Sequence, residues 1–216
     1  MKNKAAKTLQ SLRYSLYVIF HPFKGFWQLK REHKGNIGAA VSLVALMILV
    51  TIARGQFTGY LFNTSAPGSF NILSEIFSVS LMFVLWCVSN WCITTLVDGE
   101  GSFRDIVITT AFALAPMILI NIPLIVFSNI IVLEEGAFYT LFDTAALLWT
   151  AGLLLIGIMT AHQFTMLKTI GTVLIALVGM VVIVFIFILL FSLIQQFVNF
   201  CILLFDEFSA RYLSSR

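Results

Sequence analysis

This sequence has few charged residues for its length. Charged residues make up 11% of its 216 residues and hydrophobic residues 60%, whereas a soluble domain carries about 25% charged residues. Five stretches contain no Lys, Arg, Asp or Glu at all, and they cover 35–53, 76–97, 106–133, 144–167 and 169–205. A composition this poor in charge excludes an ordinary soluble globular domain.

Each uncharged stretch is long enough to cross a bilayer as a helix. A helix rises about 1.5 Å per residue and the hydrocarbon core is about 30 Å thick, so about 20 apolar residues span it. The sequence therefore predicts an all-α, polytopic transmembrane bundle of five spans. We divide the chain into a basic segment (1–34), a five-span membrane domain (35–205) and a short tail (206–216). In the last stretch we expect a span over 170–194 and then a helical extension at the membrane interface.

The positive charge of the chain is concentrated before the first span. Eight of the 13 Lys and Arg residues precede residue 35, against one acidic residue, Glu32. If the spans alternate in direction, the side that holds the N-terminus carries ten Lys and Arg residues and the other side three. The positive-inside rule then predicts a cytoplasmic N-terminus and a C-terminal tail outside.

The basic segment is predicted to hold two amphipathic helices. Apolar residues recur at helical spacing up to Phe20, and Pro22 can open a second helix because its first position needs no N–H. Aromatic and basic residues then follow at helical spacing: Phe23, Phe26, Trp27, Lys30 and Arg31. We predict that these residues anchor the helix at an anionic inner leaflet, where each basic residue gains about 1 kcal/mol. Docking of a cytoplasmic partner is an alternative that is compatible with this anchoring.

The third span is predicted to bend and to pack inside the bundle. It contains Pro116, Asn121 and Pro123, and in lipid an amide side chain or a carbonyl freed by proline needs a partner within the protein. Small residues four positions apart predict a close approach of neighbouring helices in the third and fourth spans. These residues are Ala111, Ala115, Gly157 and Ala161.

Residues with reactive side chains are scattered. The three His and three Cys show no metal-ligand spacing, and we find no zinc-protease, Walker or nucleophile-elbow motif. Asp98, Glu100 and Asp105 could bind a divalent cation together with a phosphate. We favour instead a hydrated loop in which Asp105 caps the third span. The sequence predicts no enzyme, no cofactor, no metal and no nucleic-acid partner.

The nearly uncharged spans favour a non-catalytic scaffold or accessory subunit, because carriage of ions needs charged residues deep in the spans. Arg54 and Asp143 fall at predicted span ends, and Arg54 is expected to reach outward to the surface. We interpret His162 as a packed or interfacial residue rather than a proton relay. The alternative is a small transporter or channel, in which the kinked third span lines a polar path with Asn121 facing His162.

A resemblance to a known family rests on two neighbouring motifs. They read Asp98-Gly99-Glu100-Gly101-Ser-Phe-Arg104-Asp105 and Ala111-Phe-Ala-Leu-Ala-Pro116. They resemble the Gly-rich loop after span two and the Gly-Tyr-Ser/Ala-Leu-x-Pro element of span three in the Yip (Ypt-interacting protein) membrane domain. The resemblance covers roughly residues 20–195 and includes a Phe-His-Pro-Phe-Lys-Gly sequence at 20–25 that is similar to bacterial-type members.

This resemblance implies five spans, a cytosolic N-terminus and a place in the bacterial cytoplasmic membrane. It also implies a membrane-protein partner, for which the subunits of an ABC-type transport or export system or a second copy of the chain are the candidates. Members that bind Rab GTPases carry an Asp-Leu-x-Gly-Pro motif, which this sequence lacks.

Overall fold

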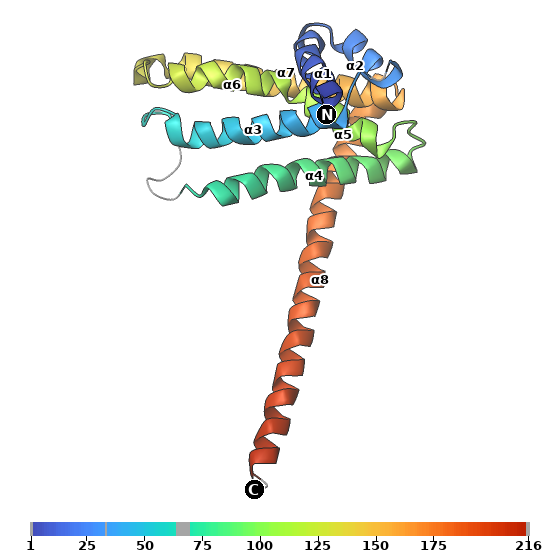
Figure 1. Cartoon of the computed structure of the whole chain (residues 1–216), viewed down its shortest axis with the longest axis vertical. Coiled ribbons are helices and arrows are strands. Elements are labelled where there is room, and N and C mark those ends of the chain that lie inside the picture. Colours follow the sequence, from blue (N-terminus) through green and yellow to red (C-terminus); the bar gives the residue numbers. More distant parts are fainter. Residues whose placement is uncertain (1, 33, 64–69, 215–216) are drawn as a thin grey trace.

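The computed structural model describes residues 2–32, 34–63 and 70–214, and in this part every regular element is a helix (Figure 1). The elements are α1 (Lys2–Phe20), α2 (Pro22–Arg31), α3 (Ile37–Phe57), α4 (Ile72–Leu96), α5 (Phe103–Ala113), α6 (Ala115–Phe127), the 3-10 turn η1 (Leu133–Glu135), α7 (Gly136–His162) and α8 (Met166–Ser214). Within the described residues, five helical segments are long and apolar enough to cross a membrane, with α5 and α6 counted as one. The predicted fold class, an all-α bundle of five spans, is confirmed.

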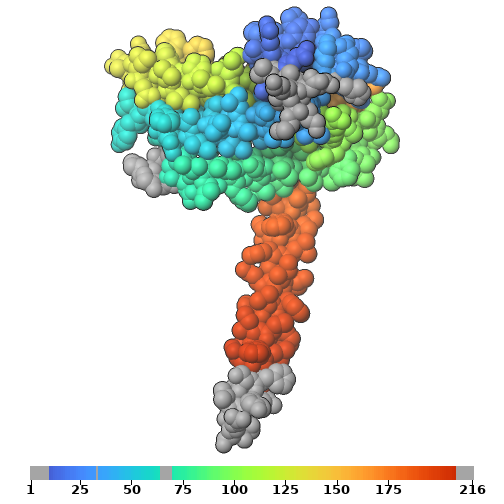
Figure 2. Space-filling view, viewed as in Figure 1, coloured from blue at the N-terminus to red at the C-terminus, as the bar shows by residue number. Residues whose placement is uncertain are grey.

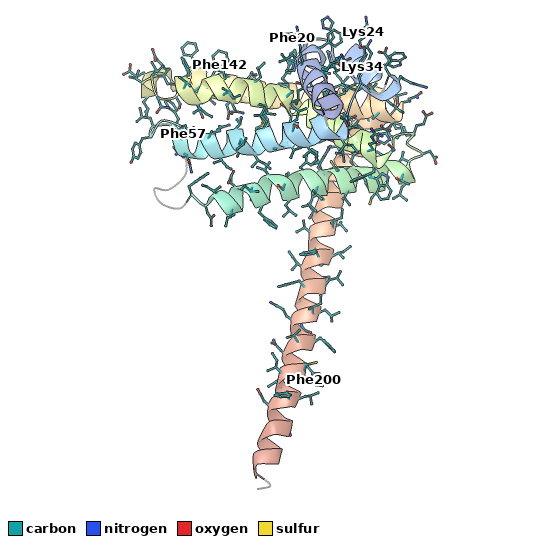
Figure 3. All side chains as sticks on the ribbon, viewed as in Figure 1. Phe20, Lys24, Lys34, Phe57, Phe142 and Phe200 are labelled. Carbon is teal, nitrogen blue, oxygen red and sulfur yellow. The ribbon has the colours of Figure 1, made fainter. Side chains whose placement is uncertain are left out.

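Four of the five spans lie side by side, and the N-terminal helices cover one end of them (Figure 1). Figure 3 shows Lys24 and Lys34 at that end, while Phe57 and Phe142 lie at the opposite end. The third span is the centre of the bundle. Half of the residues in its most apolar 18-residue segment are buried, whereas the share is 28% or less in every other span. The predicted inward position of this span is therefore confirmed.

The third span bends where the sequence predicts a bend. Helix α5 ends and α6 begins around Leu114, whose N–H donates to the Ala111 carbonyl at 3.3 Å. Pro116 has no N–H to donate to a carbonyl of the preceding turn, so the regular series of helical hydrogen bonds is interrupted at this point. Pro123 lies inside α6 and does not end it.

Small residues bring the helices together as predicted. A Cβ atom on Gly157 would lie 3.2 Å from the Phe26 ring and would overlap the Thr109 methyl group. Glycine at this position of α7 therefore lets both α2 and α5 pack against the backbone. Ala111 and Ala115 are also buried, at the centre of the bundle.

Helix α2 begins with Pro22 at its first turn, as predicted, but it packs more deeply than an interfacial anchor would. Phe26 is only 2% exposed, whereas Phe23 and Trp27 are 60% and 52% exposed. The prediction that all three rings lie at the interface is therefore wrong for Phe26, which points into the bundle because Gly157 leaves room for it. The outward rings of Phe23 and Trp27 remain available to a membrane.

Helix α8 is a single helix of 49 residues. Its first part packs on α4, where the Ser89 hydroxyl donates to the Ala176 carbonyl at 2.5 Å. No described side chain beyond Met180 is buried, and the helix runs across the bundle and projects from it (Figures 1 and 2). The helix continues past residue 194, the predicted end of the span, and into the segment predicted to be a tail. The position of this extension at the membrane interface stays a prediction. The side of the membrane that the C-terminus occupies stays a prediction.

Candidate functional site

Two spans end side by side in the same kind of turn, which positions the Gly-rich loop. Helix α4 is followed by Asp98 in the left-handed conformation, with φ of 55°. The N–H of Gly99 then bonds back to the Thr94 carbonyl at 2.8 Å. Helix α7 ends in the same way at Gln163, with φ of 56°. Such turns satisfy carbonyls at helix ends and reverse the chain sharply.

The Gly-rich loop lies directly on the ring of His162. The Gly101 N–H donates to His162 Nδ1 at 3.2 Å. A Cβ atom on Gly101 would lie 2.7–3.0 Å from three ring atoms, and one on Gly99 would lie 2.5 Å from Nδ1. Phe164 stacks on the ring at 5.4 Å between centroids. Both glycines are thus needed for the loop to approach the ring, and we call this arrangement the glycine-loop junction.

His162 is held as a neutral ring. An Nδ1 atom that accepts a hydrogen bond requires the proton on Nε2. The side chain is 2% exposed, and Nε2 has no hydrogen-bond partner among the described residues. The interpretation of His162 as a packed residue is confirmed by this burial.

Lys30 joins α2 to the glycine-loop junction. Its Nζ atom donates to the Ala161 carbonyl at 2.6 Å and lies 4.0 Å from Glu100 Oε2. A cation at the C-terminal end of a helix satisfies a free carbonyl and interacts favourably with the helix dipole. Lys30 therefore tethers α2 to the end of α7, and its role as an interfacial anchor stays a prediction. Arg31 is exposed, as an anchoring residue would be.

The remaining polar residues of the loop start α5. The Ser102 side chain accepts from the Asp105 N–H at 3.3 Å, and the Asp105 carboxylate accepts from the Ser102 N–H at 3.0 Å. Ser102 is thus the capping residue, and Asp105 completes the capping box instead of capping the helix itself. The described residues contain no group of three His, Cys, Asp or Glu that could hold a metal ion. The structure therefore does not bring Asp98 and Glu100 together with Asp105 as a cation site. Arg104 is exposed beside them.

A second polar cluster lies at the opposite end of the bundle and joins three spans. Arg54 donates to both carboxylate oxygens of Asp143, at 2.7 and 3.0 Å, and to Asn121 Oδ1 at 3.0 Å. Asn121 also donates to the Met117 carbonyl at 2.8 Å. The predicted internal hydrogen bonding of Asn121 is confirmed, but Arg54 turns inward instead of reaching to the surface. A charged group in apolar surroundings is stabilised by such a paired partner.

Beside this cluster is a cavity of about 500 Å³, which we call the Arg54 cavity. Helices α3, α4 and α7 and the segment after α3 contribute its walls, which include Arg54, Phe62, Phe70, Glu75, Tyr139 and Asp143. Sequence reasoning missed this cavity, because it arises where three helix ends meet and has no local motif.

The two polar clusters do not face each other. Asp143 and His162 are 19 residues apart on α7, which corresponds to about 28 Å along the helix. Asn121 is bound to the Arg54 cluster and His162 to the glycine-loop junction. The predicted polar path from Asn121 to His162 is therefore wrong in its geometry.

Comparison with known proteins identifies the family. Neither the curated proteins nor the solved structures give a match. The family model of the Yip1 domain matches residues 16–198. This interval contains the glycine-loop junction, the Arg54 cluster and all or part of each of the five spans. The chain therefore belongs to the Yip1 domain family of membrane proteins.

Proposed function

We propose that this protein is a non-catalytic scaffold or accessory subunit of a membrane complex. The observation that carries the proposal is the separation of its two polar clusters by a packed core. Between Asp143 and His162, the inward side of α7 presents Ala146, Leu153 and Gly157, all buried. A path for ions or polar solutes would need a series of polar groups at these levels. Thr150 of α7 and Thr109 of α5, which turns its methyl group towards Gly157, are weak substitutes.

The basic side chain of each polar cluster also has a bonding partner close by. Arg54 is paired with the carboxylate of Asp143, and Lys30 is bound to the end of α7. Polar groups used in this way hold helices at fixed positions, which is what a scaffold needs. Arg54 and Lys30 are therefore held in place and are not free to move with a solute.

The outward side of α2 is the contact surface that we assign to the membrane and to a partner. Phe23 and Trp27 expose their rings beside Lys24 and Arg31. A cleft of about 170 Å³ lies next to them, between α2 and the end of α7. Rings beside basic side chains fit an anionic inner leaflet. We propose that this end of the bundle faces the cytoplasm of a bacterial cell, with the C-terminus outside.

The family resemblance makes the subunits of an ABC-type transport or export system the leading candidates for the partner, with a second copy of the chain as the alternative. Purification of the whole chain from its own membrane in mild detergent tests this. We expect a membrane protein at a fixed molar ratio, and a smaller amount of it with the Phe23→Ser/Trp27→Ser variant. A matched Phe142→Ser variant changes an exposed ring at the opposite end and should retain the partner. A chain that purifies alone as a monomer would contradict the proposal.

A further inference from the structure

We propose that the Arg54 cavity binds a small organic ammonium group, carried by a free amine or by the headgroup of an aminophospholipid. This goes beyond the scaffold role and does not depend on it.

The charge of the cavity comes from one cation and two anions. Arg54 is bound through two hydrogen bonds to Asp143, so these two charges balance each other. Glu75 also lines the cavity and forms no ion pair among the described residues. The sequence contains no Lys, Arg or His between residues 55 and 103, and Arg54, the cation of α3 that lines the cavity, is already paired with Asp143. The cavity therefore has one uncompensated negative charge and favours a cation.

Aromatic rings form much of the remaining wall. Phe62 and Tyr139 stack at 4.9 Å between centroids, and both line the cavity with Phe70. The Phe70 ring lies so close to Gly55 that a Cβ atom there would overlap it, which seats the ring firmly against the α3 backbone. The faces of aromatic rings attract cations and are used for the recognition of organic ammonium groups.

One buried hydroxyl has no partner. Thr58 lines the cavity and is 8% exposed, and its Oγ1 atom forms no hydrogen bond with any described residue. Buried polar atoms are nearly always satisfied in folded proteins. An ammonium N–H would supply the missing donor.

The size of the cavity favours an organic ligand over a bare ion. Its volume of about 500 Å³ is within the range of about 300–1,000 Å³ that is usual for small-molecule sites. A single carboxylate without a partner is too few for a metal ion, which takes several oxygen ligands. An amine with a carbon body would occupy both the charged and the aromatic parts of the wall.

Calorimetric titration of the purified whole chain in detergent, with ethylammonium and tetramethylammonium as probes, tests the proposal. We expect saturable binding of at least one probe and a loss of at least tenfold in affinity in Glu75→Gln. The matched control is Glu134→Gln, which removes an acidic residue of the same end that does not line the cavity. It should bind like the unchanged chain.

A second variant separates binding from folding. Phe70→Leu keeps an apolar side chain and removes the aromatic face, and it should weaken binding severalfold with Glu75 intact. If Glu75→Gln unfolds, the Phe70→Leu result decides. Competition by nanodiscs of phosphatidylethanolamine, but not of phosphatidylglycerol, identifies a lipid headgroup as the source, and its absence identifies a free amine. The proposal would be overturned if neither probe bound, or if Glu75→Gln and Phe70→Leu both bound the probes as tightly as the unchanged chain. It would also be overturned if Glu134→Gln lost as much affinity as Glu75→Gln.

Discussion

Replacing Gly101 with alanine should damage the glycine-loop junction, and the structure sets the size of the effect. The new Cβ atom would lie 2.7–3.0 Å from three atoms of the His162 ring. The ring cannot easily move away, because it is 2% exposed and stacks on Phe164. Either the loop or the ring must therefore shift, and the hydrogen bond from Gly101 to Nδ1 is lost or lengthened.

Two contributions add in this variant. Overpacking of a filled core costs about 1–3 kcal/mol, and a lost hydrogen bond costs about 0.5–1.5 kcal/mol. We expect the free energy of unfolding of Gly101→Ala to fall by about 2–4 kcal/mol. Gly152→Ala is the matched control, because it lies on the same helix as His162 and nothing is within 4 Å of its added Cβ atom. It should be neutral or stabilising by up to about 1 kcal/mol.

The assay is reversible unfolding of the purified chain in mixed detergent and SDS micelles, followed by tryptophan fluorescence. A double-mutant cycle with His162→Ala assigns the cause, because removing the ring makes room for the added methyl group. In the His162→Ala protein, Gly101→Ala should lower the free energy of unfolding by less than about 0.5 kcal/mol, which is within the usual error of such cycles. Gly101→Ala with unchanged stability, or with the same cost when the ring is absent, would refute the steric reasoning.

Three further predictions follow from other contacts. Arg54→Met should destabilise the chain by about 1–3 kcal/mol in the same assay, less than for a fully buried pair because both side chains are about a third exposed. Adding Asp143→Leu should then restore stability, since no unpaired charge remains, and no recovery would show that the pair is not coupled. Phe26→Ala should cost about 3–5 kcal/mol, whereas the exposed Trp27→Ala should change stability by less than about 0.5 kcal/mol; equal effects would contradict the inward position of Phe26. Burial, with the charges of neighbouring groups, raises the pKa of Tyr14 to about 12 from its usual 10.0. The folded state therefore keeps Tyr14 protonated, and its contribution to stability is complete below pH 10 and is lost as the pH rises from 10 towards 12. In an absorbance titration, the difference between the unchanged chain and Tyr14→Phe should show one tyrosine that ionises near pH 12, and a midpoint near 10 would contradict this.

The sequence predicts those features of the fold that depend on local pattern. Uncharged stretches locate all five spans, Pro22 marks the start of α2, and Pro116 marks the break between α5 and α6. Each of these follows from hydropathy or from the missing N–H of proline, which act through neighbouring residues.

The boundaries of the spans are less accurate, for a physical reason. The fourth uncharged stretch begins after Asp143, whereas α7 begins at Gly136. A helix can include a carboxylate in apolar surroundings when a partner balances its charge, and Arg54 is that partner. The partner comes from a position 89 residues earlier, and no local pattern links the two.

The candidate sites were predicted only in part. The Gly-rich loop is recognisable from its residues, but its contact with His162 joins positions 61 apart, and the bond from Lys30 to Ala161 joins positions 131 apart. The direction of α8 across the bundle is likewise absent from the hydropathy of the helix, because a uniformly apolar helix specifies no single packing face.

The flux of ions or solutes through the reconstituted protein tests the scaffold proposal most directly. Liposomes that contain the whole chain should show no more proton or solute flux than empty liposomes. Asn121→Ala should lose the bond to Arg54, worth about 0.6–2 kcal/mol of stability in a membrane, and should leave this background flux unchanged, as should His162→Gln. A flux that requires the protein, and that disappears in Asn121→Ala while the chain stays folded, would contradict the scaffold proposal.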